Sequence, residues 1–183
     1  MTPTLPLSRP FDPSVIPGEG THRRLAAELG ERGALAAEFD LLELGALTAD
    51  LTLTRWRGDG VEIHGRVQAE LSQSCVVTLE PVAQKIDAPF VIRLVPAGSR
   101  LAEAAGREVA IDPSAEDPPD IYEGHTIDLG AIVTEQLGLA IDPYPRSPGA
   151  MLGEISYPPE AAEKPESPFG ALASLAAKPK SRP

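Results

Sequence analysis

The sequence predicts an α+β fold, in which an antiparallel β-meander packs against two or three helices and extended arms lie at both ends. Residues 47–71 hold two runs of alternating apolar and polar side chains joined by Gly58-Asp59-Gly60, a pattern typical of a β-hairpin with one buried face. Two further segments repeat their apolar residues at helical spacing. Prolines gather near the two ends. The pattern suits an open sheet and a closed barrel equally.

Residues 1–20 are expected to form an N-terminal arm, because they carry five prolines and little periodicity. Residues 22–29 fit a strand or a helix. Residues 31–44 are rich in Ala, Glu and Leu and predict a helix. The arm is expected to dock on the body through its apolar side chains Leu5, Leu7, Phe11, Val15 and Ile16.

A third strand is predicted over residues 84–95. One face would carry the apolar set Ile86, Ala88, Phe90, Ile92 and Leu94. Pro89 lies on the opposite face and has no N–H to donate, so this strand is expected at an edge of the sheet or bulged at that residue.

Residues 101–128 carry eight carboxylates and one arginine, a composition typical of a solvated loop. Its acidic residues are the candidates for binding a partner: Glu103, Glu108, Asp112, Glu116, Asp117, Asp120 and Glu123. Residues 128–141 then predict a helix with Asp128 as its N-cap. The core domain is therefore expected over 21–145, and a proline-rich tail with a short helix at 168–177 over 146–183.

The overall charge narrows the possible functions. A net charge of −11 argues against a protein held on nucleic acid by phosphate contacts, which need Lys and Arg. It suits a basic partner, or no charged partner at all, in which case the acidic segment is a solubilising insertion. The single cysteine excludes an internal disulfide and a cysteine-rich zinc site. No signal peptide and no run of ~18 apolar residues is evident, so a cytoplasmic protein is expected.

The candidates for catalysis are weak. His22, His64 and His125 lie in unlike contexts. A Cys75 nucleophile would need a base that the sequence does not show, and no glycine-rich phosphate loop is present. We therefore expect no enzyme activity, no cofactor and no metal, and keep Cys75-dependent hydrolysis as the weakest hypothesis.

A possible RNA-binding face forms the alternative. Arg55, Trp56 and Arg57 are consecutive near the hairpin turn, and Arg66 lies on the next strand. An exposed tryptophan between two arginines could stack on a base. The same tryptophan could instead pack under the N-terminal arm.

Four segments in order resemble the YceD family, also called large ribosomal RNA subunit accumulation proteins, in its alphaproteobacterial branch. They are SCVVTLEPV, KIDAPFVIRLVP, IDLGAIVTEQLGLAIDPYPR and PFGALASL. The resemblance covers roughly residues 12–177. The residues matching the family pattern are Cys75, Leu79, Glu80 and Pro81, with Asp128, Leu129, Asp142 and Pro143 at the ends of the last helix.

This chain departs from the family at its cysteines. Many members read C-x-R-C-L-E-P, where Thr78 stands here in place of the second cysteine. The cysteine-bearing segment that many members have after the helix is DPYPRSPGAM here and has none. Cys75 is therefore expected to remain as a small, buried, unpaired residue.

The resemblance implies a role in making the large ribosomal subunit and in the accumulation of 23S rRNA. It also implies a basic partner, because genes of the family often neighbour that of a small basic large-subunit ribosomal protein. It carries over no catalytic residue. The sequence thus favours a non-enzymatic factor that binds a large-subunit ribosomal protein or pre-ribosomal particle through its acidic segment. The alternative is a factor that binds the 23S precursor directly and protects or matures it.

Overall fold

Three long strands dominate the computed structural model, which describes residues 6–105 and 118–151. All described helices and strands belong to one unit, Met1–Ala150. In chain order they are β1 (Pro10–Phe11), a 3-10 turn (Pro13–Val15), β2 (Thr21–Ala26), α1 (Leu29–Glu38), β3 (Glu43–Trp56), β4 (Gly60–Ser74), β5 (Pro81–Pro96), α2 (Arg100–Ala105), β6 (Asp120–Tyr122), β7 (Ile127–Asp128) and α3 (Leu129–Ala140).

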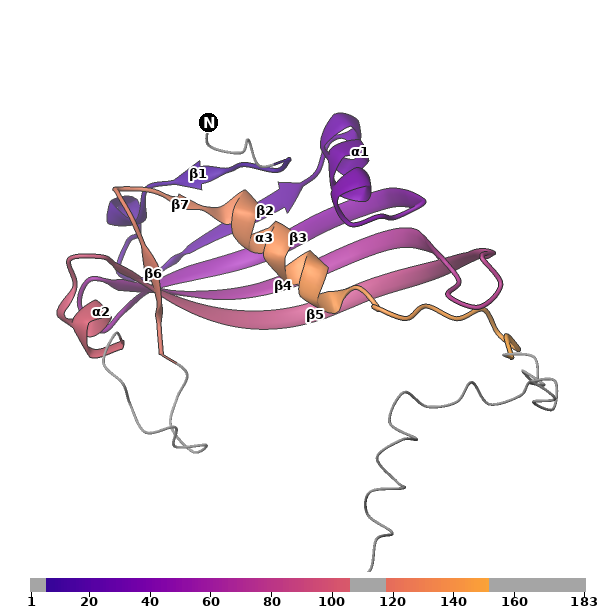
Figure 1. The fold of residues 1–183 in the computed structure, drawn as a ribbon. Helices are drawn as coiled ribbons and strands as arrows, with labels where there is room; N and C mark the ends of the chain where they lie inside the picture. The colour runs from indigo at the N-terminus through magenta and orange to yellow at the C-terminus, as the bar shows by residue number, and fades with distance from the viewer. Residues whose placement is uncertain (1–5, 106–117, 152–183) are drawn as a thin grey trace, which may run out of the picture. The chain divides into compact units, whose positions relative to one another are not determined.

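The main sheet has the strand order β2-β3-β4-β5-β6 (Figure 1). Strands β2 to β5 pair antiparallel, which confirms the predicted meander, whereas β6 runs parallel to the end of β5. In the described part of the chain the two outer strands, β2 and β6, do not pair with each other. The α+β class is thus confirmed, and the sheet is open rather than closed into a barrel.

The predicted hairpin is confirmed. Leu53 pairs with Ile63 and Ala49 with Val67, so the apolar residues of both strands share one buried face. Arg57 (φ 43°) and Gly58 (φ 91°) take left-handed backbone conformations, which match the right-handed twist of the strands in a tight hairpin turn.

Helix α3 lies across the apolar face of the sheet (Figure 1). Its Val133 and Leu137 are fully buried with Leu51 and Ile63 of the sheet. Asp128 caps the helix as predicted, since its side chain accepts from the backbone N–H groups of the first turn. The burial of an apolar stripe holds this helix on the sheet.

The N-terminal arm docks on the body, as expected, through Leu7, Phe11 and Ile16, which are buried, while Val15 is exposed. Leu5 lies outside the described residues. The arm reaches α3 closely enough that a Cβ built on Gly130 would lie 2.5 Å from the carbonyl oxygen of Leu7. Only glycine permits this close approach of two backbones.

The structure decides one open alternative and corrects one prediction. The ambiguous residues 22–29 are mainly strand β2. The helix predicted over 31–44 is wrong after Glu38, because Asp40 (φ 52°) takes a left-handed conformation that ends α1. Leu44 instead enters β3 and is buried in the sheet, followed by a register shift before Ala46. The leucines of this segment fit the apolar stripe of a helix as well as the buried face of a strand, so their spacing alone does not distinguish the two.

The acidic range 101–128 contains regular structure at both ends. Most of α2 lies at its start, and β6 and β7 lie at its end. Strand β6 pairs with β5 only at Leu94–Pro96. From Pro81 to Arg93 the described chain supplies no further strand beside β5, so Pro89 does sit on an edge, and its pairing with Arg66 shows no bulge. The short helix predicted at 168–177 lies outside the described residues.

Candidate functional site

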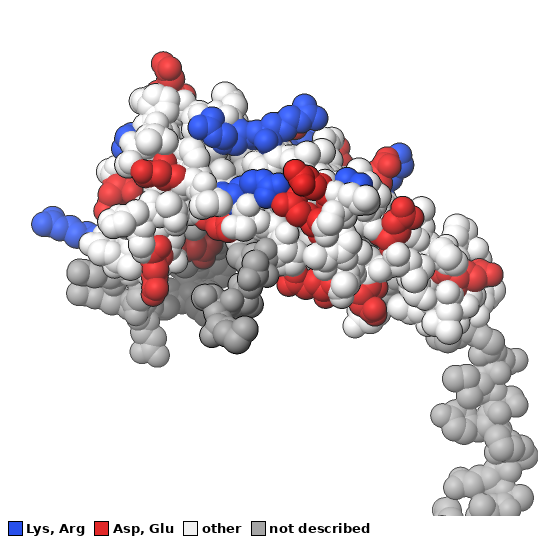
Figure 2. Space-filling model, turned by 90° about the horizontal axis from the view of Figure 1, so that it is seen from above, with Lys and Arg blue, Asp and Glu red and all other residues white. Residues whose placement is uncertain are grey.

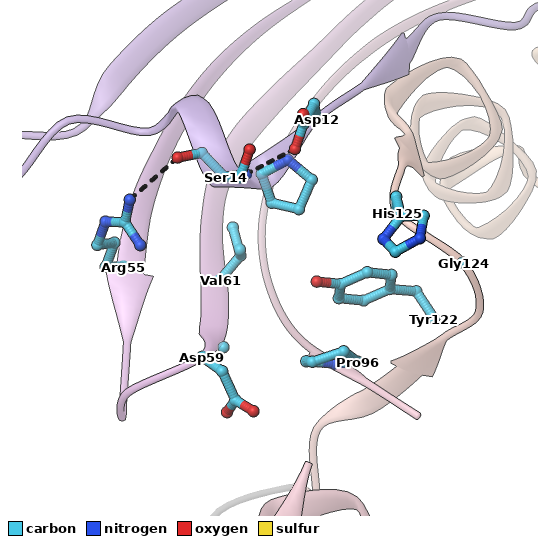
Figure 3. A pocket seen from close by; sticks show the side chains of 11 residues that line it. Asp12, Ser14, Arg55, Asp59, Val61, Pro96, Tyr122, Gly124 and His125 are labelled. Carbon is cyan, nitrogen blue, oxygen red and sulfur yellow. Dashed lines mark hydrogen bonds between the residues drawn. The ribbon is translucent and has the colours of Figure 1, made fainter. Parts of the chain in front are cut away.

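A cavity of about 390 Å³ lies at the hairpin end of the sheet, where four separate segments meet (Figure 3). The 3-10 turn of the arm forms one wall, and the β3–β4 hairpin forms another. The end of β5 and the segment following β6 complete it. The polar side chains lining the cavity are Asp12, Ser14, Arg55, Asp59, Tyr122 and His125.

Each of the two cavity carboxylates, Asp12 and Asp59, accepts a hydrogen bond that fixes its position. The Oδ1 of Asp12 accepts from the backbone N–H of Ser14 at 2.8 Å, and hydrogen bonds with Ser14 lower the pKa of this carboxyl. The Oδ1 of Asp59 accepts from the Oγ of Ser99 at 2.9 Å. Ser99 is almost completely buried, so this bond ties the hairpin turn to the chain after β5.

Tyr122 comes from β6 and points into the cavity (Figure 3). Burial raises the pKa of its hydroxyl, and the charges of Asp59 and Asp12 raise it further. Both carboxylates therefore act on the same phenol, although they come from turns far apart in the sequence.

The guanidinium of Arg55 is bound to the arm. Its Nε donates to the carbonyl of Ile16 at 3.0 Å and its Nη2 to that of Ser14 at 3.2 Å. These bonds fix the wall that carries Asp12 (Figure 3). Arg55 was expected in an RNA-binding set, and the structure places it facing the arm instead.

The other members of that set lie on the opposite, polar face of the sheet. Trp56 is half-buried, with the guanidinium carbons of Arg57 and Arg93 at 4.7 and 5.4 Å from its ring centroid. Arg66 forms a two-pronged ion pair with Asp87. The four predicted residues are therefore not brought together on one surface.

Two of the seven predicted acidic residues are close in sequence to the cavity residue Tyr122, but neither is among the residues that line the cavity. Asp120 and Glu123 are exposed and lie on either side of Tyr122 in the chain. Glu103 lies in α2, and the remaining four lie outside the described residues. Sequence reasoning missed Asp12, Asp59 and Tyr122 as members of one site. Asp59 carried only a turn signal, and nothing in the pattern marked the short strand β6.

Cys75 is buried, as expected, in the tight turn between β4 and β5. Its Sγ accepts backbone N–H groups of Val77 and Thr78 at 3.4 Å and of Ser147 at 3.3 Å. Hydrogen bonds from Thr78 and Ser147 outweigh burial and lower the pKa of this thiol to about 6.

The family-pattern residues shape this turn. The N–H of Leu79 donates to the carbonyl of Cys75, and the N–H of Cys75 donates to that of Glu80. Leu79 takes a left-handed conformation (φ 61°), and β5 starts at Pro81. The N–H of Val76 donates to the carbonyl of Pro145, so the segment after α3 lies against the turn.

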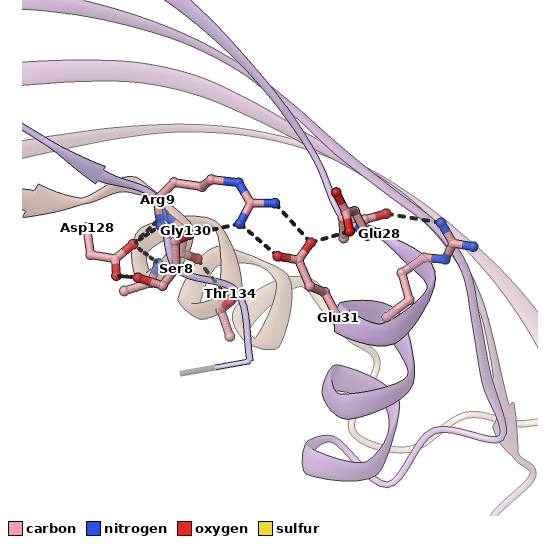
Figure 4. Close-up of polar contacts among 10 residues, drawn as sticks. Ser8, Arg9, Glu28, Glu31, Asp128, Gly130 and Thr134 are labelled. Atoms are coloured by element: carbon pink, nitrogen blue, oxygen red, sulfur yellow. Dashed lines mark hydrogen bonds and ion pairs between the residues drawn. The ribbon is translucent and has the colours of Figure 1, made fainter. Parts of the chain in front are cut away.

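The N-terminal arm is fastened beside the cavity-forming turn by charged contacts (Figure 4). The guanidinium of Arg9 donates to both carboxylate oxygens of Glu31, at 2.7 and 2.9 Å. The backbone N–H of Arg9 donates to Asp128. The arm that supplies Asp12 is thus held to both α1 and α3.

Within residues 6–105 and 118–151, no group of three His, Cys, Asp or Glu side chains lies close enough to share a metal ion. None of the helices in the same residues is both long enough and apolar enough to cross a membrane.

The chain was compared with known proteins. The profile of one family, described as large ribosomal RNA subunit accumulation protein YceD, matches residues 63–176. This match begins within β4, continues beyond α3 and covers well over half of the sequence. No curated protein and no solved structure matched the chain. On the family match, this protein belongs to the YceD family of large ribosomal RNA subunit accumulation proteins.

Proposed function

We propose that this protein is a non-enzymatic, cytoplasmic factor in large-subunit assembly that binds a basic large-subunit ribosomal protein and so supports the accumulation of 23S rRNA. Membership of the YceD family implies the role in rRNA accumulation. The choice of a protein partner rests on charge.

The observation that carries the proposal is the acidic end of the sheet. Asp12 and Asp59 line one cavity. Asp120 and Glu123, which are exposed, lie two residues before and one residue after the cavity residue Tyr122 in the chain. On the face in Figure 2, acidic side chains are seen over the surface with basic ones among them. The arginine that lines it, Arg55, is bonded to backbone carbonyls. Together with a net charge of −11, this arrangement attracts a basic protein and speeds the encounter with it.

The basic side chains on the polar face of the sheet also support a protein partner over RNA. Arg66 pairs with Asp87, Lys85 with Glu70, and Arg93 with Glu62. A phosphate would have to compete with a carboxylate at each of these cations, which weakens the counterion release that drives binding to nucleic acid.

Direct binding of 23S rRNA precursor is the second candidate, and Trp56 favours it. The ring is half-buried beside Arg57 and Arg93 rather than under the arm. Aromatic side chains flanked by arginine stack on unpaired bases in a sequence-tolerant way. This candidate predicts an affinity for RNA that falls with salt and is lost in Trp56→Ala.

Affinity purification of the tagged protein from its own cells at low salt tests the proposal, with protein and RNA both identified. The expected result is a basic large-subunit ribosomal protein without stoichiometric rRNA. Replacing the seven candidate acidic residues of 101–128, which leave out the helix cap Asp128, by Asn or Gln should weaken its capture. Asp120→Asn with Glu123→Gln alone should also weaken it.

The matched control is Glu38→Gln with Glu43→Gln. Both residues are exposed, and Glu43 begins β3, at the far end of that strand from the hairpin. The control removes the same charge as the Asp120/Glu123 variant and should leave capture unchanged. Stoichiometric 23S precursor in the eluate, lost in Trp56→Ala, would overturn the proposal in favour of RNA.

A further inference from the structure

The cavity at the hairpin end combines a charged rim with apolar walls. Asp12 and Asp59 contribute carboxylates, while Pro13, Val61 and Pro96 contribute apolar surface. Its volume of about 390 Å³ lies in the range of pockets that hold small ligands, about 300–1,000 Å³. A ligand that suits it has a cationic head and an aliphatic stem.

We propose that this cavity takes one arginine or lysine side chain from a basic polypeptide, with the cationic head at the rim that carries Asp12 and Asp59 and the methylene groups along Pro13, Val61 and Pro96. The identity of that polypeptide as a ribosomal protein rests on the proposed function. The assignment of a basic side chain to the cavity does not depend on the proposed function, because it rests on the residues that line the cavity.

The carboxylates each keep acceptor capacity for such a head. Asp12 uses Oδ1 for the N–H of Ser14, and Asp59 uses Oδ1 for the hydroxyl of Ser99. A carboxylate has about four lone-pair sites, so both side chains can accept further N–H groups. Hydrogen bonds between charged partners are roughly twice as strong as neutral ones.

The electrostatics of the interior point the same way. Burial raises the pKa of the Tyr122 hydroxyl, and the charges of Asp59 and Asp12 raise it further, so both carboxylates act on a side chain that lines the cavity. Of the residues lining the cavity, Arg55 is the one with a permanent positive charge, and its guanidinium is engaged by Ser14 and Ile16. Long basic side chains bury their stems against apolar surface while the head stays polar.

The walls are fixed before a ligand arrives. Arg55 ties the 3-10 turn to β3, the Asp59–Ser99 bond ties the hairpin turn to the end of β5, and β6 is paired with β5 next to Tyr122. A preorganised cavity loses less entropy on binding. This makes one anchored side chain a strong contributor to a larger interface.

The first test titrates the full chain with N-acetyl-arginine methylamide, followed by amide chemical shifts in NMR spectra. The matched probe is N-acetyl-citrulline methylamide, which has a similar shape and no charge. Saturable shifts at Val61 and Gly124 with the arginine probe alone are expected. Equal shifts with both probes would overturn the proposal.

The variant is Asp12→Asn with Asp59→Asn, because asparagine keeps an acceptor for Ser14 and for Ser99. It should weaken binding of the arginine probe about tenfold or more. Glu38→Gln with Glu43→Gln is the control of equal charge and should bind as the wild type does. Binding by the Asp12/Asp59 variant at wild-type strength would also overturn the proposal. Each single substitution provides a second, milder variant for the same comparison.

Capture from cells then separates this inference from the proposed function. A basic ribosomal protein captured by the wild type and the control, and lost with the Asp12/Asp59 variant, supports both. Equal capture by all three proteins overturns the inference that the cavity binds the partner and leaves the proposed function standing. Binding of the arginine probe without any ribosomal protein in the wild-type eluate overturns the proposed function and leaves the cavity standing.

Discussion

The backbone N–H of Arg9 donates to the Oδ1 of Asp128 at 2.7 Å, across 119 positions of the sequence (Figure 4). The same oxygen accepts from the N–H groups of Gly130 and Ala131 at the start of α3, and the other oxygen accepts from the hydroxyl of Ser8 at 2.5 Å. One carboxylate therefore caps a helix and fastens the arm that forms a wall of the cavity.

Replacing this carboxylate should destabilise the protein. Asp128→Ala removes the N-cap and the anchor of the arm together, and we expect a loss of about 2 kcal/mol or more in the free energy of unfolding. Asp128→Asn keeps one acceptor and should lose less. Urea denaturation of the three proteins measures this. Equal stability of the alanine variant and the wild type would contradict the role of Asp128.

The stability of the arm should depend on pH through the same group. Burial raises the pKa of Asp128, but the hydrogen bonds from Arg9, Ser8, Ala131 and Gly130 outweigh it and leave the pKa below its ordinary 3.8. A carboxyl with a depressed folded pKa contributes stability that is complete above 3.8 and is lost as the pH falls through the lower folded value.

The free energy of unfolding should therefore fall more steeply below about pH 4 in the wild type than in Asp128→Asn. Urea denaturation at several pH values compares the two slopes. Glu31 and Glu62 also have a lowered pKa and remain in both proteins, so the difference isolates Asp128. Identical slopes would show that Asp128 titrates alike in the folded and unfolded chains.

Gly130→Ala should destabilise the protein although alanine favours helices by about 1 kcal/mol. The added Cβ would lie 2.5 Å from the carbonyl oxygen of Leu7, which forces the arm and α3 apart. Gly33→Ala in α1 is the matched control, because its Cβ would meet nothing within 4 Å. Thermal unfolding should show a lower midpoint for the first variant and a higher one for the second.

The Cys75 thiol should ionise near pH 6 in the folded protein, because hydrogen bonds from Thr78 and Ser147 lower its pKa to about 6 from 9.0. Ultraviolet absorbance of the thiolate across a pH titration measures this. Ser147→Ala removes the hydroxyl that donates to Sγ at 3.5 Å and should raise the pKa. Ser74→Ala is the control, since its hydroxyl donates to the carbonyl of Leu79 instead.

The same shift links Cys75 to stability. A thiol with a depressed folded pKa adds stability that is complete above 9.0 and is lost as the pH falls through about 6. Between these values the wild type should become more stable with rising pH relative to Cys75→Ala. A constant difference between the two proteins would contradict the lowered pKa.

The elements with strong periodicity were predictable from the sequence. The β3–β4 hairpin and helix α3 with its Asp128 cap follow directly from alternation, turn residues and spacing. Strands β1, β6 and β7 have two or three residues each, too few for a period to show. Pairing with distant strands, rather than local propensity, creates them.

The candidate site was less predictable than the fold because its residues come from distant segments. Asp12 and Asp59 lie in two turns, and Tyr122 lies in the short strand β6. The acidic range contains Tyr122, but its charge pattern does not mark that residue, and nothing local to the sequence shows that the arm folds back over the hairpin. The partners of Arg55 and Arg66 are equally non-local, which is why both arginines could be read as free to meet RNA.

The bond between Arg9 and Asp128 also bears on the order of folding during translation. The arm is synthesised before the main sheet, whereas its docking partners in α3 are synthesised after the long strands of that sheet. Strands β2 to β5 pair with their neighbours in sequence and can form early, whereas contacts between distant segments close late. Nascent chains that stop before Asp128 should thus expose Leu7, Phe11 and Ile16 to chaperones and proteases until synthesis passes α3.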